Sequence, residues 1–200
     1  MHEELDFDVV AFECNAGDAF AANLEYPYED ADAALVNSIS TFWHVQENIP
    51  LFNYINQSRL SSNPLYLAGI DITQSNGSYA FSRFLKSLLT PVDPIYAENA
   101  RYADSLFTAF GVRKWTIGLT ENRHLIFDSL KNSQLFKYEE LIDFISKNRE
   151  NLSSPEKHIT AAIFYLQSRI NFIHQINRDS TYMADFLEVA PERNKSIVVV

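Results

Sequence analysis

The 200-residue sequence predicts an α/β fold, with a short, mostly parallel sheet, flanking helices and a helical insertion. Two short apolar runs, Val9–Glu13 and Leu65–Asp71, each end in a carboxylate and have the composition of strands. The segment between them has room for two or three helices, and such a long crossover is typical of parallel neighbours. A third strand is expected over 195–200, and the helical insertion over about 93–177.

Helices are predicted between the first two strands. A tight turn at Asn15–Asp18 leads into a helix over 19–26, and two shorter helices are expected over 32–38 and 40–47. Pro50 fits the first turn of a further helix, because its missing N–H is not needed there. We interpret these segments as the flanking helices of the sheet.

The second half of the chain is predicted to be mostly helical. Apolar spacing favours helices over 79–89 and 95–110, the latter ended by Gly111, and over 119–130 and 135–145. The clearest apolar stripe consists of Ile159, Ile163, Leu166, Ile170 and Ile173. Such a stripe indicates a long helix packed against others rather than a cofactor site.

Composition indicates one domain with a substantial core and disfavours several partners. Apolar residues make up 46% of the chain, the net charge is −10 and the pI is about 4.9. Without a basic stripe, we expect no nucleic-acid partner. No apolar run approaches the ~20 residues that span a bilayer, and the acidic start lacks the pattern of a signal peptide. We therefore expect a cytoplasmic protein with a small-molecule substrate.

Glu13 and Asp71 are the first candidate site residues. Carboxyl ends of parallel strands meet at one edge of a sheet, where ligands bind in open α/β folds. Two carboxylates there can act as acid and base when their surroundings differ, although helix caps or solvated ends are the alternative. Gly69 suggests a close approach by another backbone or a ligand. Cys14 carries no nucleophile signature, so we expect a small buried thiol.

Three further residues are candidates for binding a substrate. Trp43 and Glu47 lie one turn apart on a predicted helix and would share a face, so that a ring and a carboxylate could bind a ligand. The alternative places Trp43 in the core and Glu47 in solvent. Arg178 could pair with Glu13 or Asp71, or could hold an anion or oxyanion, with a surface salt bridge as the alternative.

The sequence predicts neither a metal nor a cofactor. The histidines His124, His158 and His174 are scattered without metal-ligand spacing, and the P-loop, GxGxxG and GxSxG patterns are missing. Nucleotide enzymes and the usual serine hydrolases are therefore disfavoured.

Taken in order, these motifs resemble the erythromycin esterase family, which includes proteins of succinoglycan biosynthesis. The resemblance rests on Val9–Glu13 with Asp18 and Ala19, Trp43–Glu47, Asn53–Asn56, Leu67–Ile72, Arg178–Asp179 with Met183–Ala184, and Lys195–Val200. It implies metal-independent hydrolysis of an ester or lactone, such as that of a macrolide antibiotic, by a water that a Glu and histidines activate. Glu13 would be that Glu.

Two family motifs that carry histidines have no counterpart in this sequence. We therefore expect a single domain over 1–200 that is incomplete at both ends, a central fragment of a family member that is inactive alone. The alternative is a non-catalytic small-molecule-binding or cell-envelope protein that keeps the fold. Glycoside hydrolysis by Glu13 and Asp71 is a third interpretation, which needs carboxyl groups roughly 5 to 9.5 Å apart.

Overall fold

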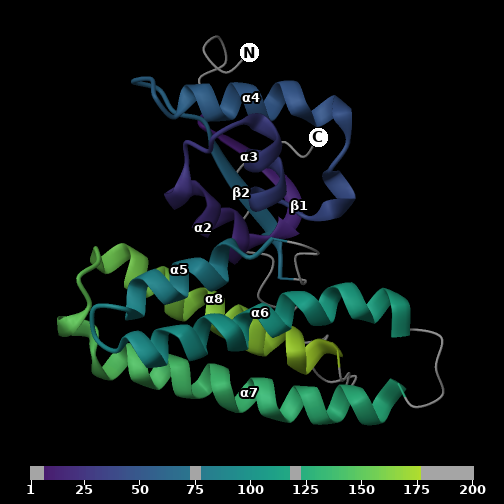
Figure 1. Cartoon of the computed structure of the whole chain (residues 1–200), viewed down its shortest axis with the longest axis vertical. Coiled ribbons are helices and arrows are strands. Elements are labelled where there is room, and N and C mark those ends of the chain that lie inside the picture. The colour runs from purple at the N-terminus through teal and green to yellow at the C-terminus, as the bar shows by residue number, and fades with distance from the viewer. Residues whose placement is uncertain (1–6, 73–77, 118–122, 177–200) are drawn as a thin grey trace, which may run out of the picture.

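The computed structural model describes residues 7–72, 78–117 and 123–176. The described sheet has two strands, β1 (Val9–Asn15) and β2 (Tyr66–Asp71), which run parallel. Helices fill the crossover between them (Figure 1). The α/β class and the parallel pair are confirmed, and the strand predicted over 195–200 lies outside the described residues.

Three helices of the crossover flank the sheet. They are α2 (Ala16–Glu25), α3 (Ala31–Ser38) and α4 (Ile49–Ser58), which has Pro50 in its first turn as predicted. Together with the strands they enclose a core that includes Ile39, Phe52, Ile55, Leu65 and Leu67. This core fixes the strands against their helices.

The segment before α4 is not the helix predicted over 40–47. It forms two separate 3-10 turns, η1 (Thr41–Trp43) and η2 (Gln46–Asn48). The carbonyl oxygen of Trp43 accepts from the backbone N–H of Val45 at 2.9 Å and from Nδ2 of Asn48 at 2.7 Å. In a continuous helix that carbonyl would accept from the backbone N–H four residues later. Side-chain bonds of this kind compete with helix formation.

Four described helices of the second half form a bundle below the sheet layer (Figure 1). They are α5 (Ala80–Leu89), α6 (Pro94–Ile117), α7 (Arg123–Lys147) and α8 (Glu156–Ile176), with a 3-10 turn, η3 (Arg149–Asn151), before α8. The helical character of this region is confirmed, whereas an insertion over about 93–177 stays a prediction, because the strand expected after it lies outside the described residues. Two predicted helix boundaries are wrong. Helix α6 continues past Gly111, and the helices predicted over 119–130 and 135–145 are one helix, α7. A single glycine costs only roughly 1 kcal/mol within a helix, so packing can override it.

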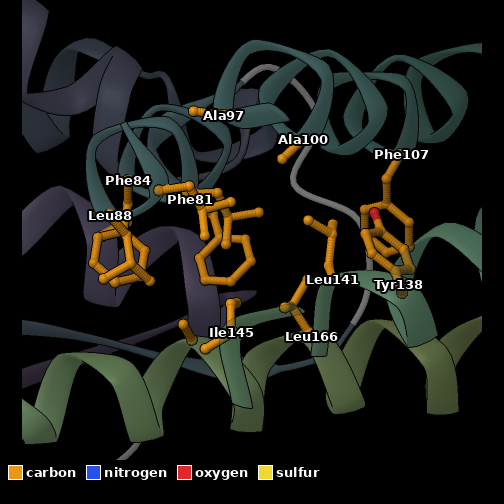
Figure 2. Close-up of a cluster of buried hydrophobic side chains, with 14 of the residues drawn as sticks. Phe81, Phe84, Leu88, Ala97, Ala100, Phe107, Tyr138, Leu141, Ile145 and Leu166 are labelled. Atoms are coloured by element: carbon orange, nitrogen blue, oxygen red, sulfur yellow. The ribbon is translucent and has the colours of Figure 1, made fainter. Parts of the chain in front are cut away.

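The bundle has its own core, in which side chains from α5, α6, α7 and α8 meet (Figure 2). Phe81 of α5 and Leu166 of the α8 stripe are fully buried there, and each such side chain contributes roughly 1.5–3 kcal/mol. Helix α2 belongs to both cores: Ala19 packs with the sheet, whereas Ala21 and Ala22 pack with the bundle. Helix α2 is therefore the element that joins the sheet to the bundle.

Candidate functional site at the carboxyl edge of the sheet

Asn15 joins the ends of both strands to the start of α2. Its Oδ1 accepts hydrogen bonds from the backbone N–H groups of Gly17 (3.0 Å) and Asp18 (3.2 Å), which makes it the N-cap of α2. Its Nδ2 donates to the carbonyl oxygen of Ile72, just beyond β2, at 3.4 Å. One buried side chain thus holds together the edge where both strands end.

The two strands lose their regular register close to this edge. Phe12 pairs with Gly69, but Asn15 pairs with Asp71, so that β1 uses one residue more than β2 between the two pairs. A Cβ on Gly69 would lie 2.6 Å from backbone atoms of Asn15. The close backbone approach predicted at Gly69 is therefore confirmed. Bulges of this kind redirect side chains and are common beside active sites, and this one contains Glu13.

Glu13 lies in this bulge with its side chain exposed to solvent. The expectation that Glu13 ends the strand is wrong, because β1 continues through Cys14 and Asn15, both of which are buried. The bulge accounts for the difference, since it lets the last two residues turn into the core while Glu13 faces outward. The catalytic role of Glu13 stays a prediction.

Trp43 holds the backbone of Glu13. Its indole Nε1 donates to the carbonyl oxygen of Glu13 at 3.0 Å. The ring also packs edge-on against Phe12, with centroids 5.8 Å apart, and against the exposed Phe42, at 5.4 Å. Two of the predicted site residues are therefore in contact, although Trp43 reaches Glu13 through the main chain rather than through the carboxylate.

The structure describes two of the three other predicted site residues. Asp71 is half-buried at the end of β2, at the same edge as Glu13. Glu47 is exposed on η2, and the prediction that it shares a helix face with Trp43 is wrong, because the two belong to separate 3-10 turns. Arg178 lies outside the described residues.

Cys14 is buried at the same edge, as predicted. Burial, together with the charges of Asp18 and Asp71, raises the pKa of its thiol from 9.0 to about 12. A thiol with this pKa is almost fully protonated near neutral pH and is a poor nucleophile. The carboxylates, not the thiol, are therefore the reactive candidates of this edge.

Sequence reasoning missed a buried charged cluster directly behind the edge. Arg169 of α8 lies between two carboxylates: its Nε is 2.9 Å from Oδ1 of Asp104, and its Nη2 is 3.6 Å from Oδ1 of Asp18. Asp104 also accepts hydrogen bonds from Ser82 (2.8 Å) and Tyr138 (3.0 Å). The side chains of Arg169, Asp18 and Asp104 are each at most 1% exposed. We call these three residues the buried triad.

Aromatic rings enclose the guanidinium of the triad. It lies over Phe81 and Phe107, with 4.7 and 4.5 Å from its central carbon to the ring centroids. Burial disfavours the charged form of Arg169, but Asp104 and Asp18 more than offset this effect, so that its pKa is raised. Burial, together with Asp104, also holds the pKa of Tyr138 well above its ordinary value. Arg169 thus stays charged, and Tyr138 stays a neutral donor to Asp104.

The sequence carries one signal for this cluster. Arg169 stands three residues after Leu166 and directly before Ile170, within the apolar stripe of α8. A charged residue inside a buried stripe is almost always paired, but its partners lie on α2 and α6, far away in the sequence.

The described residues show neither a metal site nor a membrane-spanning helix. No group of three or more His, Cys, Asp and Glu side chains within 7–72, 78–117 and 123–176 could hold a metal ion. None of the helices in these ranges is both long and apolar enough to cross a bilayer.

An edge of this kind, with carboxylates and a helix N-terminus where parallel strands end, defines an α/β protein with a candidate ligand site at its sheet edge. The chain is 29% identical over 198 residues to a protein of Bacillus subtilis (strain 168) named "Putative hydrolase YbfO". The alignment covers 96% of this chain and 42% of that protein, so the chain spans less than half the relative's length. No family model and no solved structure matches the chain.

Proposed function

We propose that this chain is the central part of a hydrolase that cleaves an ester or lactone without a metal ion, similar to the erythromycin esterase family. The observation that carries the proposal is the exposed Glu13, which lies in a bulge at the carboxyl edge with its backbone held by Trp43. Similarity to a protein named as a hydrolase supports the same class.

In this proposal Glu13 accepts a proton from the attacking water. A base needs access to solvent and a fixed position, and the bulge together with the indole hydrogen bond supports both. Asp71 is half-buried at the same edge. In this proposal the two carboxylates share the roles of acid and base.

In this proposal the hydrogen-bond donors that stabilise the developing oxyanion are not the N–H groups of Gly17 and Asp18 in the first turn of α2. The N–H groups of Gly17 and Asp18 are already donated to Asn15. We assign that role to Arg178 and to histidines outside this chain, as the family resemblance implies. The 200 residues alone should therefore bind a substrate without turning it over.

A substrate panel tests the proposed reaction class. The polypeptide encoded by the whole gene is incubated with p-nitrophenyl esters, small and macrocyclic lactones, and p-nitrophenyl glycosides, each with and without EDTA. We expect turnover of an ester or lactone that EDTA leaves unchanged. Loss of activity with EDTA, or hydrolysis of glycosides alone, would contradict the proposal.

The alternative is a non-catalytic small-molecule-binding protein of the same fold. The exposed ring of Phe42 favours it, since this ring is 77% exposed and packs against Trp43, whose indole donates to the backbone of Glu13. Saturable binding of panel compounds that quenches tryptophan fluorescence, without turnover of any of them, would establish this alternative in place of the hydrolase.

A further inference from the structure

We infer that Arg169 is a positioning residue, which holds the carboxyl edge of the sheet in place from inside the helical bundle. It acts through Asp18 on the start of α2 and thereby on the end of β1. The consequence for catalysis rests on the proposed function, whereas the mechanical consequence does not.

A short chain of contacts connects Arg169 to the edge. Its Nη2 faces Oδ1 of Asp18 at 3.6 Å, and the same oxygen accepts the backbone N–H of Phe81 at 3.2 Å. Asp18 donates its own N–H to the capping Asn15. Asn15 follows the bulge that contains Glu13. Three steps thus lead from a side chain of the bundle to the candidate active site.

The charges of the triad make this connection sensitive to Arg169. Two carboxylates, each at most 1% exposed, share one guanidinium. Without the cation, both buried carboxylates would lose this opposite charge, which is strongly unfavourable. Asp104 would still keep the donors Ser82 and Tyr138. Asp18 would keep the backbone N–H of Phe81. It is the more easily released of the two, because it lies in the first turn of a helix at the sheet edge.

Release of Asp18 should loosen the start of α2 and expose Cys14. This residue is the only cysteine of the chain, and it is 2% exposed, directly before Asn15. Its reaction with a thiol reagent therefore reports local opening of the edge. The electrostatic effect has the opposite sign: removal of a cation raises the pKa of the thiol and slows its reaction. Loss of the Arg169 charge by itself therefore cannot speed the labelling.

The experiment measures the labelling rate of Cys14 by DTNB in folded Arg169→Met, Arg169→Lys and wild-type protein, together with urea unfolding of each. Leu141→Ala, a bundle-core change on α7, is the control for global destabilisation, and Arg149→Met, which breaks the exposed pair with Glu156, is the control for loss of a surface cation. We expect Arg169→Met to label about tenfold faster or more than Leu141→Ala at equal global stability, and Arg169→Lys to restore part of the protection.

Two outcomes would overturn the inference: labelling of Arg169→Met no faster than that of Leu141→Ala, or equal labelling of the Met and Lys variants. If Arg169→Met does not fold, Arg169→Lys carries the test, since it keeps the charge but loses the planar fork. Cys14 of Arg169→Lys must then label faster than Cys14 of wild type, at a global stability matched to that of Leu141→Ala. Equal labelling rates of Arg169→Lys and wild type would overturn the inference. Because the readout needs no substrate, it stays valid if the proposed hydrolase activity fails.

Discussion

The indole Nε1 of Trp43 donates a 3.0 Å hydrogen bond to the carbonyl oxygen of Glu13. This bond crosses from a 3-10 turn to the bulged end of β1, and Asn48 in turn holds the carbonyl of Trp43. The aromatic residue and the carboxylate therefore belong to one rigid arrangement, in which the ring positions the backbone from which the Glu13 side chain extends.

Trp43→Phe should weaken this arrangement while keeping most of the ring contact with Phe12. The loss of one partly exposed hydrogen bond should cost about 1 kcal/mol of unfolding free energy, which urea denaturation measures. The control is Phe42→Leu, since this ring is 77% exposed and its loss should change stability by less than about 0.5 kcal/mol. Equal effects of the two changes would show that the indole bond contributes nothing.

Gly69→Ala should be poorly tolerated. The added Cβ would meet backbone atoms of Asn15 and Cys14 at 2.6 Å, and backbone cannot rotate away as a side chain can. We expect a loss of roughly 3 kcal/mol. Gly17→Ala is the matched control, because its Cβ would meet side-chain atoms of Tyr165 and Asn15 at 3.1–3.2 Å and should cost less. Thermal and urea unfolding give both values, and the reverse order would contradict the bulge geometry.

Tyr138→Phe tests the polar contacts of the buried triad. The phenol donates to Asp104 at 3.0 Å and is fully buried, so its removal leaves one carboxylate oxygen with less compensation. We expect a loss of about 1–3 kcal/mol in urea unfolding. Tyr102→Phe, on the exposed side of α6, should have almost no effect. An unchanged free energy of unfolding in Tyr138→Phe would mean that the triad does not need this donor.

Stability should fall at alkaline pH in a way that depends on Cys14. The unfolded thiol loses its proton near pH 9.0, whereas the folded thiol keeps it until about pH 12. In this window the folded state binds more protons, so the free energy of unfolding decreases as pH rises, by at most ~1.4 kcal/mol per pH unit. Tyr26 adds a similar effect above pH 10.0.

Cys14→Ala should flatten this dependence between about pH 8 and about pH 10, before the tyrosines contribute. Urea unfolding at several pH values measures the slope, and any cavity left by the smaller side chain shifts the whole curve without changing the slope. Parallel curves for Cys14→Ala and wild type would show that the thiol is not held in its protonated form by the fold.

Patterns of local periodicity predicted most of the fold. The two strands and the α8 stripe follow from apolar patterns within each segment, and the start of α4 follows from Pro50. The parallel pairing follows from the length of the crossover between the strands. The segment over 40–47 could not be predicted in this way, because the side chain of Asn48 competes for the Trp43 carbonyl. The helix end expected at Gly111 was also wrong, since one glycine costs only roughly 1 kcal/mol within a helix and is a weak stop signal.

The candidate site was less accessible to sequence reasoning. The carboxyl ends of parallel strands lie at one edge of a sheet. This rule of topology predicted that Glu13 and Asp71 lie at the same edge. The extra residue in β1 depends on how closely Gly69 approaches Asn15, which no local pattern encodes. The buried triad joins α2, α6 and α8, so only the packed structure shows that Asp18 and Asp104 are the partners of Arg169.

The role of Glu13 is most directly tested by the turnover number of Glu13→Gln in the polypeptide encoded by the whole gene, on the best ester or lactone of the panel. The control is Glu29→Gln, an exposed change in the loop after α2. If Glu13 removes a proton from water, its variant should lose about 10²–10⁴-fold in kcat with an unchanged urea midpoint, whereas Glu29→Gln should retain wild-type activity. Turnover by Glu13→Gln equal to that of wild type would contradict the account.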